Sequence, residues 1–186
     1  MNLANKISII RIVLIPFFIW AIVYYSTERD YLRFVALGFF GLAVLSDAVD
    51  GYLARVLKQR TTLGTFLDPI ADKLLLITAF ICLSVLDNLP ASLRLPPWVP
   101  IIVVSRDVII ILGAVVIFLM AGVVEISPSW LGKATTFFQM ATIISVLLKY
   151  PHSNYIWNLA VVFTVLSGID YVIRGTRLLN ENHKRK

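Results

Sequence analysis

The sequence predicts an all-α protein built from a bundle of six transmembrane helices. Of its 186 residues, 59% are hydrophobic and 15% are charged, and the mean hydropathy is +0.84. A soluble domain of this length could not bury so much apolar surface. Six apolar stretches each have about the 17–25 residues that a helix needs to cross the hydrocarbon core of a bilayer. Because the connections are short, we expect a single membrane-embedded domain over residues 1–186.

The six expected helices are separated by connections that contain four of the eight prolines. They cover residues 7–25, 34–54, 69–86, 97–121, 131–149 and 154–173. Pro16 lies inside the first helix and predicts a kink there. Pro69 fits the first turn of the third helix, where a missing N–H costs nothing. Pro97, Pro128 and Pro151 precede or open the last three helices.

The basic residues predict how the chain lies in the membrane. Six spans place both termini on one side, and 12 of the 17 Lys and Arg residues flank that side, against 4 on the other and one inside a span. The positive-inside rule then puts both termini in the cytoplasm, as for a multi-pass protein of the cytoplasmic (inner) membrane. The tail of residues 182–186, which contains Lys184, Arg185 and Lys186, would meet anionic lipid headgroups. We expect no nucleic-acid partner, since no basic face with interleaved aromatics lies outside the spans.

Seven chemically distinctive residues and one alanine stand at fixed spacing where the second span meets a polar loop. The pattern reads Asp47-x2-Asp50-Gly51-x2-Ala54-Arg55-x8-Gly64-x3-Asp68-x3-Asp72. Carboxylates are costly near hydrocarbon, so a cluster of them there indicates a functional site. The first two aspartates share a helical face, and the last two are four residues apart. Two helix ends can therefore point four carboxylates at one spot. Oxygen-only ligands favour Mg²⁺ or Mn²⁺.

The alternative is a set of solvated loop aspartates, or carboxylates paired with Arg55, Lys58 and Lys73. So many fixed positions rarely coincide by accident, so we favour a pair of divalent ions. Two metals about 3.5–4 Å apart can clamp a phosphorus centre and stabilise a leaving phosphate. Arg55 offers a planar fork suited to phosphate, although it could instead pair with a neighbouring aspartate.

The small residues of the pattern, Gly51, Ala54 and Gly64, would let a nucleotide and its diphosphate approach the helices closely. Close packing between helices is the alternative explanation for all three. The first span opens with Asn5-x2-Ser8-x2-Arg11, whose polar groups share one helical face. A helix cap plus a snorkelling arginine would also explain this second pattern.

The aspartate pattern resembles the signature of the CDP-alcohol phosphatidyltransferases, D-x2-D-G-x2-A-R-x8-G-x3-D-x3-D, at every position over 26 residues. The resemblance implies the CDP-alcohol phosphotransferase fold, two Mg²⁺ or Mn²⁺ ions, and a CDP-linked lipid as donor. An acceptor hydroxyl would attack the lipid-side phosphorus and release CMP. Family analogy also implies a homodimer.

The resemblance assigns roles by motif position. Asp47 and Asp68 would bridge both metals, and Asp50 would bind the first. Asp72 would bind the second metal and act as general base toward the acceptor hydroxyl. The residues implied to contact the CDP-diacylglycerol are Gly51, Ala54, Arg55, Thr61 and Gly64, together with Asn5 and Ser8, since family members carry N-x2-[ST]-x2-R in the first span.

A second basic set could hold an anionic acceptor. It consists of Arg106 in the fourth span, Lys133 at the start of the fifth and Arg174 at the end of the sixth. An arginine inside a span needs an anion, a carboxylate partner or water. Asp107 is adjacent to Arg106 but lies about 100° round the helix. Asp170 could pair with Arg174 at spacing four, so a structural ion pair is the alternative there.

Two short segments indicate which acceptor the protein uses, and each favours a different one. Gly132-Lys133-x2-Thr136-x2-Gln139 resembles a segment of bacterial phosphatidylglycerophosphate synthases, which implies glycerol 3-phosphate. Those synthases usually carry R-E-x6-R in the fourth span, where this chain has Ala114 in place of the second arginine. Ser105-Arg106-Asp107-Val108 resembles instead the S-R-D-V of mitochondrial-type cardiolipin synthases. We expect transfer from CDP-diacylglycerol to glycerol 3-phosphate, with phosphatidylglycerol as the close alternative acceptor.

The alternative from another class is a cation channel or transporter that uses the aspartates as an ion path. Such a path should carry polar groups across the full membrane depth, whereas these crowd toward one face. The second and third spans do not recur later in the chain, which also counts against an inverted-repeat transporter.

Overall fold

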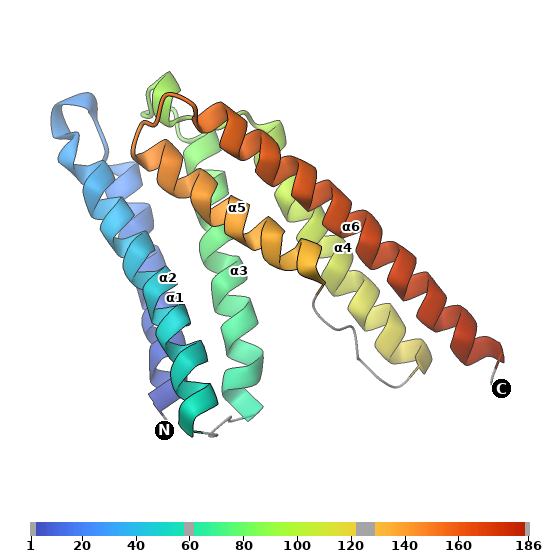
Figure 1. Ribbon diagram of the computed structural model, residues 1–186. Helices are drawn as coiled ribbons and strands as arrows, with labels where there is room; N and C mark the ends of the chain where they lie inside the picture. Colours follow the sequence, from blue (N-terminus) through green and yellow to red (C-terminus); the bar gives the residue numbers. More distant parts are fainter. Residues whose placement is uncertain (1–2, 58–61, 122–128, 185–186) are drawn as a thin grey trace. The chain divides into compact units, whose positions relative to one another are not determined.

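The computed structural model describes residues 3–57, 62–121 and 129–184, with side chains for 10–46, 73–117, 119 and 129–177. Within these ranges the chain is all-helical, as predicted, and has no strand (Figure 1). The six α-helices are α1 Leu3–Val23, α2 Tyr31–Leu57, α3 Thr62–Val85, α4 Trp98–Ala121, α5 Trp130–Leu147 and α6 Ser153–Lys184. Two short 3₁₀-helices, Thr27–Arg29 and Ala91–Leu93, lie in the connections.

The third helix begins earlier than the sequence predicts. It starts at Thr62, so Pro69 is the eighth residue of α3 and not part of its first turn. The placement expected for Pro69 is therefore wrong. Residues 62–68 contain a single glycine and no proline, so nothing in them stops the helix from extending toward α2. Only residues 58–61 separate the two helices.

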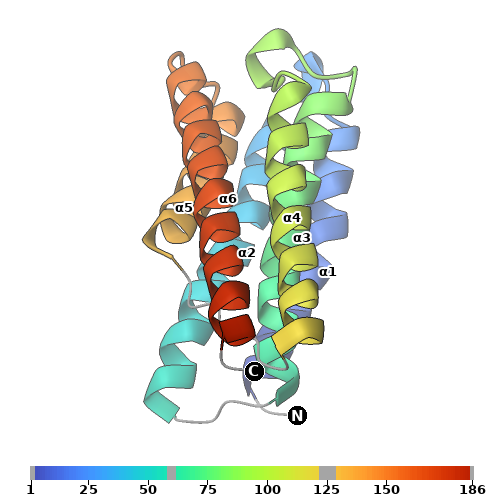
Figure 2. The same ribbon diagram turned by 90° about the vertical axis from the view of Figure 1, so that its right-hand side faces the viewer.

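The first compact unit contains α1, α2, α3 and residues 143–150. In this unit α1 packs along both α2 and α3 (Figures 1 and 2). Phe18 and Phe40 meet between α1 and α2 with ring centroids 6.1 Å apart, and both are fully buried. Fully buried alanines such as Ala36 on α2 and Ala79 on α3 bring the helix axes close.

One side chain caps the end of α1 within this unit. The amide nitrogen of Asn88 lies 2.9 Å from the carbonyl oxygen of Ile22, 3.0 Å from that of Val23 and 2.9 Å from that of Tyr25. The last carbonyls of a helix have no partner inside the helix. Asn88 therefore supplies donors that the α1 backbone cannot supply itself, and it ties the α3–α4 connection to α1.

A second polar cluster joins the α1–α2 connection to the end of α5. The carboxylate of Asp30 accepts hydrogen bonds from Lys149 Nζ at 2.5 Å, Arg33 Nε at 2.8 Å and the Tyr25 hydroxyl at 3.1 Å. Arg33 also donates to the Leu147 carbonyl at 3.0 Å. Hydrogen bonds from Lys149 and then Arg33 lower the pKa of Asp30 from 3.8 to about 2. The Asp30 partnership in turn raises the pKa of Lys149.

Lys149 also ends α5 with its backbone. Its φ is 54°, in the left-handed region. The Lys149 N–H donates to the Val146 carbonyl at 2.8 Å, and the Tyr150 N–H donates to the Ser145 carbonyl at 2.9 Å. This pair of bonds is the Schellman arrangement, which usually carries glycine at the left-handed position.

We expect Asp30→Asn to lower the melting temperature of the detergent-solubilised protein at neutral pH, because it removes a charged acceptor from two cations. The pKa of Asp30 is lower in the folded protein than its usual value of 3.8. Its contribution is therefore complete above that value and is lost as the pH falls through about 2. The melting temperatures of the wild type and of Asp30→Asn should therefore converge as the pH falls from 3.8 to about 2. A constant difference between them down to pH 2 would contradict the assignment.

The second compact unit contains residues 97–142 and 151–186. Its main contact is between α4 and α6, which lie side by side (Figure 2). The Tyr171 hydroxyl donates to the Ile110 carbonyl at 2.9 Å. A Cβ at Gly113 would lie 2.7 Å from Tyr171 Cε1, too close for any side chain there unless the ring moves. Glycine at position 113 is thus what lets Tyr171 lie against α4.

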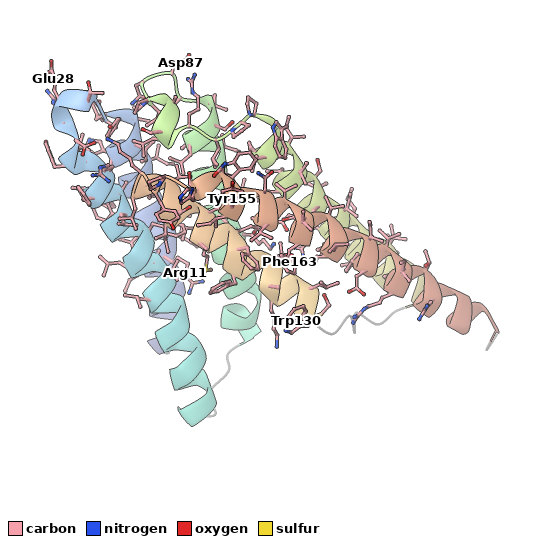
Figure 3. All side chains as sticks on the ribbon, turned by 45° about the horizontal axis from the view of Figure 1, so that its top comes forward. Arg11, Glu28, Asp87, Trp130, Tyr155 and Phe163 are labelled. Carbon is pink, nitrogen blue, oxygen red and sulfur yellow. The ribbon has the colours of Figure 1, made fainter. Side chains whose placement is uncertain are left out.

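Many apolar side chains project outward from the helices (Figure 3). On α4, Ile101, Ile111 and Leu112 are all exposed. Two stretches of the described chain, Ala91–Ile117 and Ser153–Arg177, are long and apolar enough to cross a membrane. The shorter stretches Ile10–Val23, Tyr31–Ser46 and Lys73–Val85 are also apolar. Apolar surface of this extent facing outward is typical of a membrane protein.

Candidate active site

The aspartate pattern lies on two consecutive helices of the first unit. Asp47 and Asp50 belong to the last 11 residues of α2, and Asp68 and Asp72 to the first 11 residues of α3. The short 58–61 connection makes α2 and α3 a helical hairpin, and the two helices contact each other. The backbone thus places the four aspartates at the connected ends of one hairpin (Figure 1). Their side chains lie outside the described part, so the meeting of the carboxylates stays a prediction.

The donor set of the pattern fits two hard divalent cations. It offers four carboxylates and no sulfur or imidazole, which is the chemistry that Mg²⁺ and Mn²⁺ prefer. Among the residues whose side chains the structure describes, no group of three or more His, Cys, Asp or Glu could hold a metal. The four motif aspartates lie outside that set and remain the candidate metal ligands.

The residues expected to contact the CDP part are placed by backbone alone. Asn5 and Ser8 lie in the first turns of α1, and Gly64 lies in the first turn of α3. The residues of α2 in this group are Gly51, Ala54 and Arg55. Thr61 and the side chains of the others lie outside the described residues.

Arg11, three residues beyond Ser8, has a described side chain, and it is completely buried (Figure 3). A snorkelling arginine keeps its charged head in water, so this alternative is wrong for Arg11. A buried guanidinium is stable only beside acceptors or anions. The burial of Arg11 is therefore consistent with a polar site at this end of α1.

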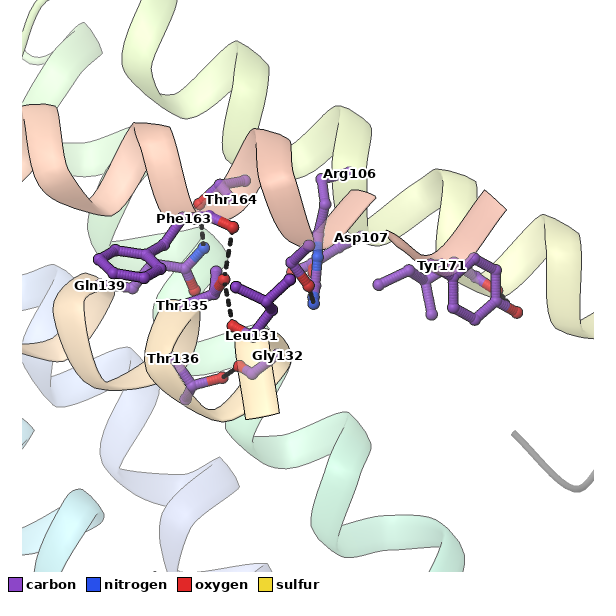
Figure 4. Close-up of polar contacts among 12 residues, drawn as sticks. Arg106, Asp107, Leu131, Gly132, Thr135, Thr136, Gln139, Phe163, Thr164 and Tyr171 are labelled. Carbon is purple, nitrogen blue, oxygen red and sulfur yellow. Dashed lines mark hydrogen bonds and ion pairs between the residues drawn. The ribbon is translucent and has the colours of Figure 1, made fainter. Parts of the chain in front are cut away.

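Arg106 has a fixed environment in the second unit (Figure 4). Its side chain is nearly buried, and its Nη1 donates to Asp107 Oδ1 at 2.8 Å. Its Nη2 donates to Ser167 Oγ on α6 at 2.6 Å. The expectation that Asp107 points away from Arg106 is wrong. Their Cβ atoms diverge on the helix, but the long arginine side chain reaches round to the neighbouring carboxylate.

The start of α5 lies beside this guanidinium. The Gly132 N–H donates to Ser129 Oγ at 3.1 Å, which caps the helix, and Lys133 is exposed in the first turn. A Cβ at Gly132 would lie 3.5 Å from Arg106 Nη2. The positive end of α5 and the Arg106 guanidinium thus form a basic corner, where an anion would be stabilised, and Lys133 is the residue after Gly132 in the sequence.

Arg174 is engaged differently from the other two basic residues. Its Nε donates to Asp170 Oδ1 at 2.9 Å, and its side chain is 46% exposed. The i, i+4 ion pair expected from the sequence is confirmed. Arg174 lies seven residues beyond Ser167, which is about two helical turns. Arg106 and Arg174 are therefore each paired with a carboxylate, and Arg106 in addition lies beside the start of α5.

The sequence interpretation missed Ser167 and the polar contacts between α5 and α6. Gln139 Nε2 donates to Thr164 Oγ1 at 3.2 Å, and the Thr135 hydroxyl lies 2.9 Å from the Phe163 carbonyl (Figure 4). All of these polar side chains are buried. Hydroxyl residues at spacing three inside an apolar span, as Thr164 and Ser167 are, would have been the available signal.

An apolar cavity of about 440 Å³ lies between α4 and α6. Arg106 forms part of its wall, and most of the rest consists of aliphatic side chains such as Ile102, Ile109 and Val165. A fatty acyl chain has the same apolar character as this lining.

Comparison with known proteins identifies the family. The model of the CDP-alcohol phosphatidyltransferase family matches residues 1–166, which extend over both compact units. The chain is 36% identical over 184 residues to a probable phosphatidylglycerophosphate synthase of Mycobacterium tuberculosis, covering 95% of this chain and 82% of that protein. It is 33% identical over 199 residues to the CDP-diacylglycerol--glycerol-3-phosphate 3-phosphatidyltransferase of Bacillus subtilis, covering 98% and 99%. The protein of the same name from Aquifex aeolicus is 32% identical over 187 residues, covering 96% and 98%. With its complete aspartate signature and this family match along most of its length, the chain belongs to the CDP-alcohol phosphatidyltransferase family.

Proposed function

We propose that the protein transfers a phosphatidyl group from CDP-diacylglycerol to the hydroxyl of glycerol 3-phosphate and releases CMP. The observation that carries the proposal is the unbroken eight-position signature on the α2–α3 hairpin. The names of the relatives from Bacillus subtilis and Aquifex aeolicus support the same donor and acceptor. The chain is thus proposed to be a transferase of anionic phospholipid biosynthesis.

The donor half of the site is proposed to use the motif residues. Asp47, Asp50, Asp68 and Asp72 would hold two Mg²⁺ or Mn²⁺ ions, which neutralise the diphosphate and stabilise the departing phosphate when bound. Gly51, Ala54 and Gly64 leave room for the nucleotide, together with Asn5, Ser8, Arg55 and Thr61.

Asp72 would accept the proton of the acceptor hydroxyl. The hydroxyl oxygen forms a new bond to the lipid-side phosphorus, the bond from that phosphorus to the CMP oxygen breaks, and CMP leaves. A carboxylate is a weak base in water. Crowding by like charges raises the pKa of a carboxylate, while metals lower it.

The acceptor half is proposed to use the basic corner of the second unit. Glycerol 3-phosphate carries nearly two negative charges on its phosphate at neutral pH. Arg106 supplies a planar fork, Lys133 an ammonium group, and the start of α5 its positive dipole end. Arg174 is proposed as a further contributor, and Asp170 takes part of its charge as Asp107 does for Arg106.

The proposal is tested with purified protein, Mg²⁺ and CDP-diacylglycerol, with one acceptor supplied at a time. We expect CMP to appear with glycerol 3-phosphate, and its formation to stop when EDTA removes the metal. Phosphatidylglycerol, inositol phosphate and serine serve as parallel acceptors. If none of the acceptors yields CMP, the transferase proposal is wrong.

Phosphatidylglycerol is the second candidate acceptor, giving cardiolipin. Two observations favour it. Both Arg106 and Arg174 are paired with aspartates, which leaves less positive charge for a dianion. The apolar cavity that Arg106 borders would suit an acceptor with an acyl chain.

Ala114→Arg tests the choice between the two acceptors. We expect the variant to use glycerol 3-phosphate better relative to phosphatidylglycerol, by about 10-fold, because one added charge-assisted hydrogen bond is worth about 1.5–3 kcal/mol. The measurement is the ratio of kcat/KM for the two acceptors. Ala114→Lys serves as the matched control, since it adds the charge without the fork. An unchanged ratio in both variants would remove position 114 from the acceptor site.

The proposed arrangement in the membrane is a six-span protein of the cytoplasmic (inner) membrane with both termini and the active site on the cytoplasmic side. The two long apolar stretches and the excess of basic residues on one side support it. A homodimer is proposed by family analogy alone. Reactivity of cysteines introduced at residues 2 and 186, in sealed vesicles of known orientation, tests the placement of the termini.

A further inference from the structure

Hydrogen bonds to residues of α4 and α6 hold the guanidinium of Arg106. Within α4 its Nη1 is held by Asp107, and across to α6 its Nη2 is held by Ser167. Both partners are only 2% exposed, so water does not compete for these bonds. Together they restrain both terminal nitrogens of the guanidinium, one on each side of the fork.

Two glycines leave the space in which the arginine side chain lies. A Cβ at Gly168 on α6 would lie 3.5 Å from Arg106 Cγ, and one at Gly132 on α5 would lie 3.5 Å from Nη2. Each position could take a methyl group in ordinary contact, but a longer side chain would displace the stem or the head of Arg106. The small size of these two residues therefore leaves the space that the observed position of Arg106 occupies.

Holding the Arg106 side chain in place lowers the entropy that it loses when it binds a phosphate. A free arginine side chain has about 2 kcal/mol of rotamer entropy to lose when it binds a ligand. One that is already held loses less, so a phosphate gains affinity without any new contact. A guanidinium has five N–H groups. The bonds to Asp107 and Ser167 use one each, and the buried Nε has no hydrogen-bond partner among the described residues.

We propose that Asp107 and Ser167 are positioning residues that hold the Arg106 guanidinium ready for the phosphate of the acceptor. The inference rests on the proposed function, in which Arg106 binds glycerol 3-phosphate. Neither residue touches the substrate; both act through Arg106. Arg174 makes a useful contrast, because its half-exposed side chain has only the Asp170 bond as a described restraint.

The test compares Ser167→Ala with Ser167→Thr in detergent-solubilised protein with Mg²⁺. We expect Ser167→Ala to raise the KM for glycerol 3-phosphate about 10-fold, as expected for the loss of one hydrogen bond to a charged group. The KM for CDP-diacylglycerol and the kcat at saturating acceptor should change less than about twofold. Ser167→Thr keeps the hydroxyl and should restore most of the affinity.

Thr164→Val is the matched control. Thr164 lies one turn earlier on α6, is equally buried and bonds to Gln139, with no bond to Arg106 among the described contacts. The loss of the Thr164 hydroxyl should lower the melting temperature about as much as Ser167→Ala does. It should not raise the KM for glycerol 3-phosphate selectively. Asp107→Asn is the second variant, and it should also raise that KM selectively, while Asp107→Glu should recover part of the affinity.

The outcomes are separable. If wild-type protein releases no CMP with glycerol 3-phosphate, the proposed function fails before this inference is reached. If the wild type is active and both Ser167→Ala and Asp107→Asn keep its KM for the acceptor, the positioning role is wrong. The same conclusion follows if the two substrates lose affinity equally, or if Thr164→Val gives the same KM shift. If Ser167→Ala fails to fold, the two variants Asp107→Asn and Asp107→Glu test the positioning role on their own.

Discussion

Asp47→Asn and Asp68→Asn are each expected to reduce CMP formation by at least about 10²–10³-fold, the loss seen when one preorganised charge-stabilising group is removed from an active site. By motif position each of these carboxylates would bind both metal ions, so one substitution weakens two sites. Asn keeps the size of the side chain, and the melting temperature should stay close to that of the wild type. The measurements are kcat at saturating substrates and a thermal melt in detergent.

The control for this pair is Asp87→Asn. Asp87 lies in the α3–α4 connection, its side chain is 98% exposed, and it pairs with Arg94 at 2.6 Å. A surface pair of this kind contributes little. Its removal should leave kcat unchanged. If Asp47→Asn or Asp68→Asn keeps most of its activity over a Mg²⁺ titration, the assignment of metal ligands has to be given up.

Arg106→Met is expected to have two separate effects. It removes the guanidinium that pairs with the buried Asp107 carboxylate at 2.8 Å, which costs about 3–5 kcal/mol of stability. It also removes the proposed phosphate fork and should lower kcat/KM for glycerol 3-phosphate by at least about 10²-fold. Arg106→Lys should recover part of the stability but less of the affinity, because an ammonium is not a planar fork.

The double variant Arg106→Met with Asp107→Leu separates these effects. Replacing both members of a buried ion pair by apolar residues is often neutral or stabilising. The melting temperature should therefore return toward that of the wild type, while the use of glycerol 3-phosphate stays impaired. If the double variant regains both stability and acceptor use, Arg106 serves only the fold.

The helices could be predicted from hydropathy because each expected span corresponds to one helix of the structure. Their ends were harder to predict, since nothing in residues 62–68 stops α3 from starting before Pro69. Helical periodicity also gives the direction of each Cα–Cβ bond but not the reach of a long side chain. For that reason it missed the bond between Arg106 and Asp107, yet predicted the pair of Arg174 and Asp170, whose residues share a face.

One part of the candidate site could likewise be predicted from the sequence, and another part could not. The aspartate signature could be found from spacing alone because it is local in sequence and chemically distinctive. The environment of Arg106 could not, because Ser167 and Gly132 come from other helices and are small, common residues. Contacts between distant segments depend on how the helices pack, and a single sequence carries no direct record of that packing.

At the end of α5, the backbone conformation and the ion pair of Lys149 favour different residue types at the same position. A glycine at position 149 would relieve the left-handed backbone, a benefit of about 1 kcal/mol, but would give up the ammonium that Asp30 binds. No natural side chain satisfies both demands at that position. A more stable variant would therefore need two changes: glycine at position 149, and a new basic residue at a neighbouring position to pair with Asp30. Changing residue 149 alone would gain one contribution and lose the other.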